Sequence, residues 1–249
     1  MNLGGNKILK IRNNKLNINY ILSNNKSYYY EFIKTKKLKQ KSYSNLRDAC
    51  VYVLNCDKKS FLKYENISFS LKPGTCITIQ NYNFEIHATN VEIFITGKYI
   101  NKSIKKSFIP ISKSNIYKVN KPWGYEQWLT GKNNSNFCFK KIFLKEGNKT
   151  SLQYHNFKKE TNFLYNGKIK LHFFSNKFNK KNFDKKYISS KILNKFSIID
   201  VIPPIIHRIE SISDTELFEV STPHLDDVIR LEDVTNRLDG KINSEHKKN

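Results

Sequence analysis

Three side chains that can bind a metal ion lie close together between Gly147 and Gly167. Gln153 and His155 are two residues apart in a strand-like segment, and Glu160 follows five residues later. Because residues i and i+2 of a strand point to the same face, Gln153 and His155 can reach one point inside a sheet. Glu160 can return to that point from the next strand. The alternative is an ordinary surface or core pair of His and Glu.

A fourth candidate ligand, His207, is expected at the end of another strand, formed by an apolar segment that is broken by Pro203 and Pro204. Together with Gln153, His155 and Glu160 it makes a set of two oxygen and two nitrogen donors, which suits a borderline or hard divalent ion. We therefore expect one divalent transition metal, with Zn²⁺ favoured and Mn²⁺, Fe²⁺, Ni²⁺ or Co²⁺ as alternatives. Coordination positions would remain open for a substrate.

The segments that must position these ligands have the pattern of strands. From residue 55 to residue 220, apolar and polar residues alternate with Gly, Pro and Asn between the runs, and helical periodicity is poor. This pattern predicts an all-β barrel. Two segments are ambiguous. Residues 44–54 combine a helix cap at Ser44 with the strand-favouring VYVL, and residues 225–237 fit either a closing helix turn or a last strand.

The first half of the sequence repeats the second half in a degraded form. A shift of 73 residues places residues 71–74 on residues 144–147. The same shift pairs Gln80 with Gln153, Tyr82 with His155, Phe84 with Phe157 and His87 with Glu160. The match indicates duplication of one β unit, and chance agreement in a Lys- and Asn-rich chain is the alternative. Because Tyr82 replaces the imidazole, we expect the first copy to bind no transition metal.

Composition narrows the class of protein. The 249 residues carry a formal charge of +23, but the lysines are interleaved with Asn and Ile along the whole chain. No recognition helix, zinc finger or RNA-binding aromatic motif accompanies the charge, so we expect small anionic ligands and no nucleic acid. The four cysteines form no CxxC pair and are expected to be reduced thiols. The sequence shows neither a signal peptide nor a membrane span, so we expect a cytoplasmic protein.

The motifs resemble those of a known family. The segment from Gly147 to Gly167 resembles the first cupin motif, with Gln where many cupins have His, and His207 resembles the ligand of the second motif. Three further segments narrow the resemblance within the cupins: KPWGYEQW at 121–128, SLQYH at 151–155 and EVSTPHLDDVIRLED at 219–233. They are similar to the type II phosphomannose (mannose-6-phosphate) isomerases and to small cupins found with sugar nucleotidyltransferases.

This resemblance spans residues 121–237 and departs at Pro204, where the second motif usually has Gly. It implies a cupin fold, which is a double-stranded β-helix or jelly-roll barrel. Combined with the internal repeat, it predicts a bicupin with a degenerate cupin-like domain at residues 1–110 and a metal-binding cupin domain at residues 111–249. A homodimer is expected from the exposed faces of the barrels.

The resemblance also implies catalytic roles for three residues. Arg230, in DDVIR, matches an Arg that lies over the metal site, Glu219 matches an acid in the preceding strand, and Lys158 matches a Lys two residues before the ligand Glu. The alternatives are a surface pair for Lys158 and its neighbour Lys159, a water-facing strand position for Glu219, and a salt bridge for Arg230. The aspartates that such a salt bridge would use are Asp226, Asp227 and Asp233.

The function implied is metal-dependent aldose–ketose isomerisation of a sugar phosphate in nucleotide-sugar or polysaccharide synthesis. The alternative is a non-catalytic cupin that binds a sugar or a sugar nucleotide and partners a nucleotidyltransferase. An oxygenase is a third candidate, which Gln153 disfavours because an amide is a poorer iron ligand than an imidazole.

Overall fold

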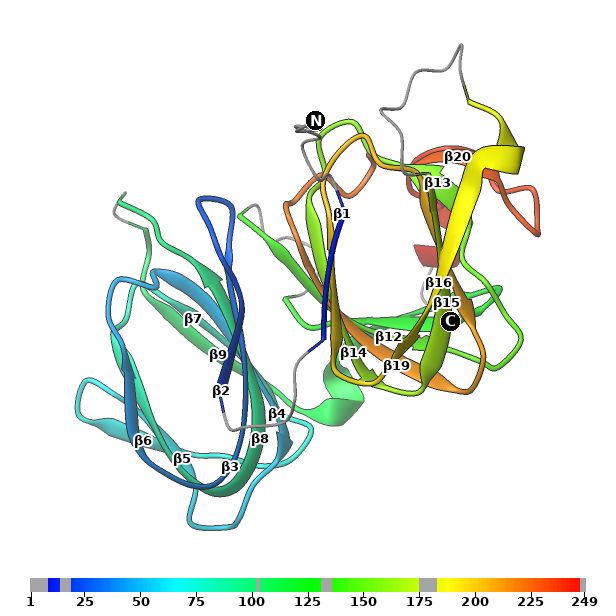
Figure 1. Cartoon of the computed structure of the whole chain (residues 1–249). Coiled ribbons are helices and arrows are strands. Elements are labelled where there is room, and N and C mark those ends of the chain that lie inside the picture. Colours follow the sequence, from blue (N-terminus) through cyan, green and yellow to red (C-terminus); the bar gives the residue numbers. More distant parts are fainter. Residues whose placement is uncertain (1–8, 14–18, 102–103, 131–135, 175–182, 247–249) are drawn as a thin grey trace, which may run out of the picture. The chain divides into compact units, whose positions relative to one another are not determined.

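The computed structural model describes the chain except for residues 1–8, 14–18, 102–103, 131–135, 175–182 and 247–249. The described residues form strands that belong to three sheets, together with three short 3₁₀ turns (Figure 1). The predicted all-β class is therefore confirmed. No helix in this part of the chain is long and apolar enough to cross a membrane.

The strands are grouped as follows. The seven-stranded sheet has the order β1 (Leu9–Asn13), β17 (Ser197–Val201), β14 (Glu160–Asn166), β19 (Thr215–Ser221), β12 (Cys138–Leu144), β11 (Gly124–Trp128), β10 (Tyr117–Lys121). The five-stranded sheet has the order β16 (Ile188–Asn194), β15 (Lys168–Phe174), β18 (His207–Ser211), β13 (Leu152–Tyr154), β20 (Ile229–Glu232). The eight-stranded sheet contains β2 (Asn19–Asn24), β3 (Tyr29–Tyr43), β8 (Phe84–Lys98), β4 (Asp48–Asn55), β7 (Cys76–Gln80) and β9 (Ser107–Ile111), with β5 (Phe61–Tyr64) and β6 (Ile67–Ser70) attached through β8. The 3₁₀ turns are Lys113–Asn115, Lys185–Tyr187 and Asn243–His246.

The chain divides into two compact units. Unit 1 comprises the described parts of residues 1–15, 118–127 and 141–249, and unit 2 those of residues 16–117 and 128–140. Strand β1 pairs with β17 in an antiparallel register, so it belongs to the sheet of unit 1. The domains predicted at residues 1–110 and 111–249 group β1 with the first half of the chain instead.

Unit 1 contains the five-stranded sheet and most of the seven-stranded sheet (Figure 1). An apolar core is formed by buried residues of both sheets. Its buried residues include Leu144, Leu164, Leu171 and Leu217, which come from strands of both sheets. The chain passes from β14 to β15 through Gly167, whose φ of +93° is readily adopted only by glycine. This turn carries the chain from one sheet to the other.

Unit 2 is built around the two 15-residue strands β3 and β8, which pair with each other. In β8, the buried Phe84, Ile86 and Ala88 alternate with partly exposed residues, which is the period of two expected for a strand with one covered face. In the ambiguous segment 44–54, residues 48–54 belong to strand β4 rather than to a helix, because their apolar side chains are buried in this sheet. Likewise, residues 229–232 of the ambiguous segment 225–237 form a strand.

In the first copy of the predicted duplication, the residues that match the candidate metal ligands contact other side chains of unit 2. Gln80 donates to Asp48 at 3.5 Å and accepts a hydrogen bond from Ser107 at 3.0 Å, while His87 lies against Phe61. Strand β7 lies between β4 and β9, and its counterpart β13 lies between β18 and β20. Because β4 precedes β7 in the chain whereas β18 follows β13, the residue-by-residue correspondence stays a prediction.

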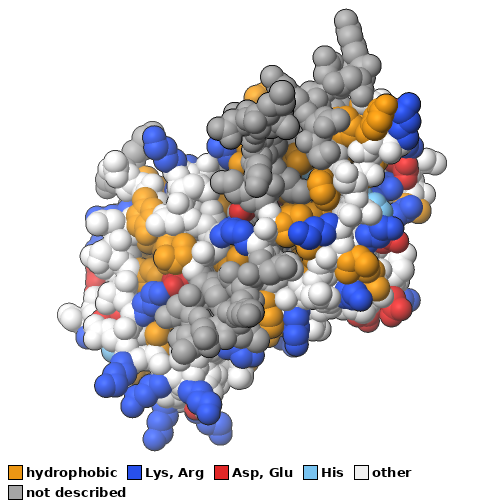
Figure 2. All heavy atoms as spheres, in the orientation of Figure 1, with side chains coloured by type: hydrophobic (Ala, Val, Ile, Leu, Met, Phe, Trp, Pro, Cys, Tyr) orange, Lys and Arg blue, Asp and Glu red, His pale blue; other side chains and the backbone are white. Residues whose placement is uncertain are grey.

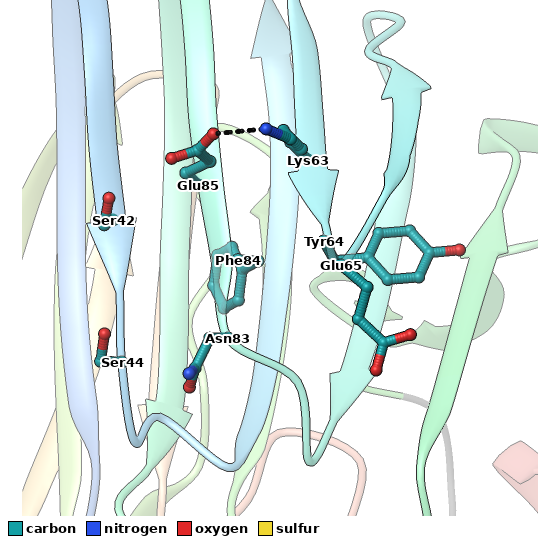
Figure 3. Close-up of a pocket in the computed structure, with 8 residues that line it drawn as sticks. All are labelled: Ser42, Ser44, Lys63, Tyr64, Glu65, Asn83, Phe84 and Glu85. Atoms are coloured by element: carbon teal, nitrogen blue, oxygen red, sulfur yellow. Dashed lines mark ion pairs between the residues drawn. The ribbon is translucent and has the colours of Figure 1, made fainter.

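The distribution of basic side chains and one surface pocket are relevant to ligand binding. Lys and Arg side chains occur across the visible face of the molecule, which agrees with lysines that are dispersed in the sequence (Figure 2). Unit 2 contains a pocket of about 300 Å³ beside the ends of β3, β5 and β8, where Lys63 faces Glu85 at 3.8 Å (Figure 3). Its lining residues are Ser42, Ser44, Lys63, Tyr64, Glu65, Asn83, Phe84 and Glu85. None of them is a predicted site residue.

Candidate metal centre

Three strand ends in unit 1 position the predicted ligands. His155 directly follows β13, Glu160 is the first residue of β14, and His207 is the first residue of β18. Gln153 lies directly opposite His207 in the β13–β18 pair. Because directly opposite residues of an antiparallel pair share a face of the sheet, Gln153 is placed beside His207.

The structure brings His155, Glu160 and His207 into one buried cluster. The Nε2 atom of His155 is 3.2 Å from Oε1 of Glu160, and Nε2 of His207 is 3.7 Å from Oε2 of the same carboxylate. One ligand atom from each residue lies within 4.8 Å of the others. The three residues are 1%, 4% and 4% exposed, respectively.

The orientation of His155 is set by the loop that precedes β20. Nδ1 of His155 contacts the carbonyl oxygen of Asp227, which can only accept a hydrogen bond, so Nδ1 carries the proton. In the neutral ring, Nε2 then presents its lone pair to the cluster. The Asp227 carboxylate accepts hydrogen bonds from the backbone N–H groups of Asn156, Phe157 and Lys158 at 3.0, 2.6 and 2.8 Å. Asp227 therefore fixes both the ring and the turn that follows it.

His207 is oriented in a similar way. Its Nδ1 donates to the carbonyl oxygen of Ile205 at 3.2 Å, which leaves Nε2 directed at Glu160. Burial lowers the pKa of His207 to about 4, although the nearby Glu160 carboxylate acts in the opposite direction. The imidazole is therefore neutral at pH 7 and available as a nitrogen ligand.

Lys158 and Glu219 extend this cluster. Nζ of Lys158 donates to Oε1 of Glu160 and, at 3.0 Å, to Oε1 of Glu219. Burial alone would lower the pKa of Lys158, but attraction by the two carboxylates outweighs it and the pKa is raised. For Glu160, burial would raise the pKa, and attraction by Lys158 and His155 outweighs burial and lowers it. Both groups are charged at pH 7.

Arg230 is placed differently from the role that the sequence implies. It lies opposite Gln153 in the β13–β20 pair, but its guanidinium donates to the carbonyl oxygens of Leu238 and Gly240 and to Oγ of Ser151. These contacts bind the segment after β20 to the start of β13. Among the contacts of the described residues, none joins the Arg230 side chain to His155, Glu160 or His207. The position of Arg230 over a metal ion therefore stays a prediction.

Sequence reasoning missed two residues that support the cluster. One is Asp227, which was considered only as a salt-bridge partner of Arg230. The other is Asn162, whose Nδ2 donates to Oε2 of Glu160 at 3.4 Å. Asn162 was detectable in principle, because it lies two residues after Glu160 in the same strand and shares its face. Asp227 lies about seventy residues from the turn that it binds, and no local spacing reveals it.

The cluster meets the requirements of a divalent transition metal. It offers two imidazole nitrogens and one carboxylate, which is a set of ligands used for Zn²⁺ and other first-row ions. Nε2 of His155 is buried and makes no hydrogen bond with the described residues. A nitrogen that can act as a metal ligand is therefore available inside the cluster. The residues present therefore fit a metal ion.

Comparisons with known proteins agree with the fold. No family model and no curated protein sequence matches the chain. Among solved structures, it is similar to a cupin 2 conserved barrel domain protein from Leptotrichia buccalis, with 13% identity, a TM-score of 0.54, and coverage of 86% of this chain and 88% of that one. It is also similar to the E. coli protein Ylba, with 11% identity, a TM-score of 0.61, and coverage of 89% and 96%.

A third similar structure is Bacillus subtilis oxalate decarboxylase, described with Mn(II) centres, which has 9% identity, a TM-score of 0.54, and coverage of 88% of this chain and 81% of that one. At these identities the likeness concerns the fold. The protein therefore has the all-β fold of the cupin barrels, and the matches extend over both of its units. None of these comparisons shows a specific similarity to phosphomannose isomerases.

Proposed function

We propose that the protein is a metal-binding cupin whose centre consists of His155, Glu160 and His207, with Gln153 as a fourth ligand. The observation that carries this proposal is the buried convergence of two imidazoles and one carboxylate within 4.8 Å. Support comes from the Mn(II) centres of a structurally similar oxalate decarboxylase. A metal bound here would act as a Lewis acid that polarises a substrate oxygen.

Lys158 and Glu219 give the proposed centre groups that can bind or move protons. Isomerisation of an aldose to a ketose needs a base that carries a proton between adjacent carbons and a cation beside the developing oxyanion. Glu219 is a candidate base and Lys158 a candidate cation, since their side chains form an ion pair at the edge of the ligand cluster. We therefore keep mannose-6-phosphate isomerase-like turnover of a sugar phosphate as the finer proposal, which the sequence resemblance carries.

The second candidate is a non-catalytic cupin that binds a sugar or a sugar nucleotide. The contacts of Arg230 favour it, because a guanidinium that donates to Leu238, Gly240 and Ser151 has fewer N–H groups left for a substrate phosphate. Both candidates require the same metal centre and differ in turnover.

Metal content tests the shared part of the proposal. We expect about one transition-metal ion per wild-type chain by elemental analysis, and a large loss in His155→Ala and His207→Ala because each removes a ligand. His172→Ala is the matched control, since His172 pairs with Glu210 at 2.6 Å and should leave the metal content unchanged. Equal metal content in all four proteins would refute the centre.

Turnover separates the two candidates. A coupled assay of aldose and ketose phosphates should show metal-dependent interconversion that falls by orders of magnitude in His155→Ala. Loss of turnover in Glu219→Gln, assayed at a metal concentration that saturates the variant, would support Glu219 as the base. Binding of a sugar nucleotide without turnover under any of the candidate metals would favour the binding protein.

A further inference from the structure

Lys158 places an ammonium group inside the candidate metal centre. Its side chain is 6% exposed, and Nζ donates to Oε1 of Glu160 and to Oε1 of Glu219. Oε1 of Glu160 is also the oxygen nearest to Nε2 of His155, at 3.2 Å. The oxygen that would complete a metal site with His155 is therefore already bound by a cation of the protein itself.

The charges of the cluster explain why this cation is needed. Without Lys158, the two buried carboxylates of Glu160 and Glu219 would lose the ammonium that they share, which is costly in a low-dielectric interior. A divalent ion beside Glu160 would neutralise the same carboxylate and would repel the ammonium at short range. The metal ion and the Lys158 ammonium therefore compete for Oε1 of Glu160, because each weakens the binding of the other at this oxygen.

We propose that Lys158 is a built-in competitor of the metal ion for Glu160, and that Glu219 is the partner that retains the ammonium when a metal binds. The inference rests on the proposed metal-binding function and deepens it. Binding of a metal exchanges the Lys158–Glu160 ion pair for a metal–carboxylate bond, while the Lys158–Glu219 contact at 3.0 Å persists. Lys158 therefore lowers the affinity of the centre and makes its metal exchangeable.

Titration of metal-free protein with Zn²⁺ or Mn²⁺ alone tests the competition. Lys158→Met should bind either ion at least tenfold more tightly than wild type, which corresponds to about 1.4 kcal/mol. Lys159→Met is the matched control, because it removes the same charge from the adjacent, exposed position and should change the affinity less than twofold. Glu219→Gln should weaken binding, since the ammonium then has Glu160 as its remaining carboxylate partner.

Lys158→Met removes the ammonium that two buried carboxylates share, and the variant could fail to fold without metal. In that event the variant and Lys158→Gln are purified with Zn²⁺, and the rate of metal loss to excess EDTA is compared with that of wild type. Slower loss from both variants supports the competition, and equal or faster loss overturns it. Wild type that binds metal no more weakly than Lys158→Met would overturn this inference alone, whereas wild type that binds no metal would overturn the proposed function as well.

Discussion

At the scale of single residues, strand spacing indicated which side chains could meet, whereas the support from Asp227 left no local signal in the sequence. The two-residue spacing of Gln153 and His155 and the position of Glu160 in the next strand follow from strand periodicity alone. His207 was predicted at the end of a strand, but Pro203 and Pro204 separate it from the end of β17, and it is the first residue of β18. Asp227, which orients His155 through contacts across a long separation in sequence, has no local signature.

We expect Asp227→Ala to weaken metal binding by about 10- to 100-fold, the usual effect of removing a group that orients a ligand. The backbone carbonyl at this position remains, but the three N–H groups of residues 156–158 lose their acceptor, so the turn that carries His155 loosens. Calorimetry measures the metal affinity of the variant, and circular dichroism shows whether it is folded. Asp226→Ala is the control, because the exposed neighbouring carboxylate should be dispensable; an equal effect of both changes would argue against the role of Asp227.

At the scale of elements, the strands of unit 1 bring the ligands together because the chain changes sheets at defined turns. Gly167 links the end of β14 to the start of β15, and a Cβ at this position would lie 2.6 Å from the carbonyl oxygen of Asp214. Alternation of apolar residues predicted the strands, since burial on one face requires that period. It did not predict which strands pair, because pairing is set by packing between distant segments.

Two glycines with positive φ provide a matched test of that turn. Gly167→Ala should lower the free energy of unfolding by more than Gly147→Ala, because only the former adds a clash with neighbouring backbone, while a Cβ at Gly147 meets nothing within 4 Å. Gly147→Ala should cost about 1–2 kcal/mol, the ordinary penalty of a left-handed backbone for a residue with a Cβ. Urea denaturation measures both values. A smaller loss in Gly167→Ala than in Gly147→Ala would contradict the account of this turn.

At the scale of the whole molecule, the sequence predicted two β units, and the structure shows two units with the cupin fold. Which residues belong to which unit was harder to predict from the sequence. Strand β1 pairs with β17 from the far end of the chain, and residues 128–140 belong to unit 2. Long-range pairing of this kind depends on complementary edges rather than on any local motif. The lysines are dispersed along the sequence, and Lys and Arg side chains likewise occur across the visible face of the molecule (Figure 2).

The most direct test of the metal centre is an anomalous-scattering map from crystals of the protein grown with Zn²⁺ or Mn²⁺. We predict one strong peak about 2.0–2.2 Å from Nε2 of His155, Nε2 of His207 and an oxygen of Glu160, with Lys158 bound to Glu219. The absence of a peak in unit 1, or a peak elsewhere with Lys158 still bound to Glu160, would contradict the metal centre.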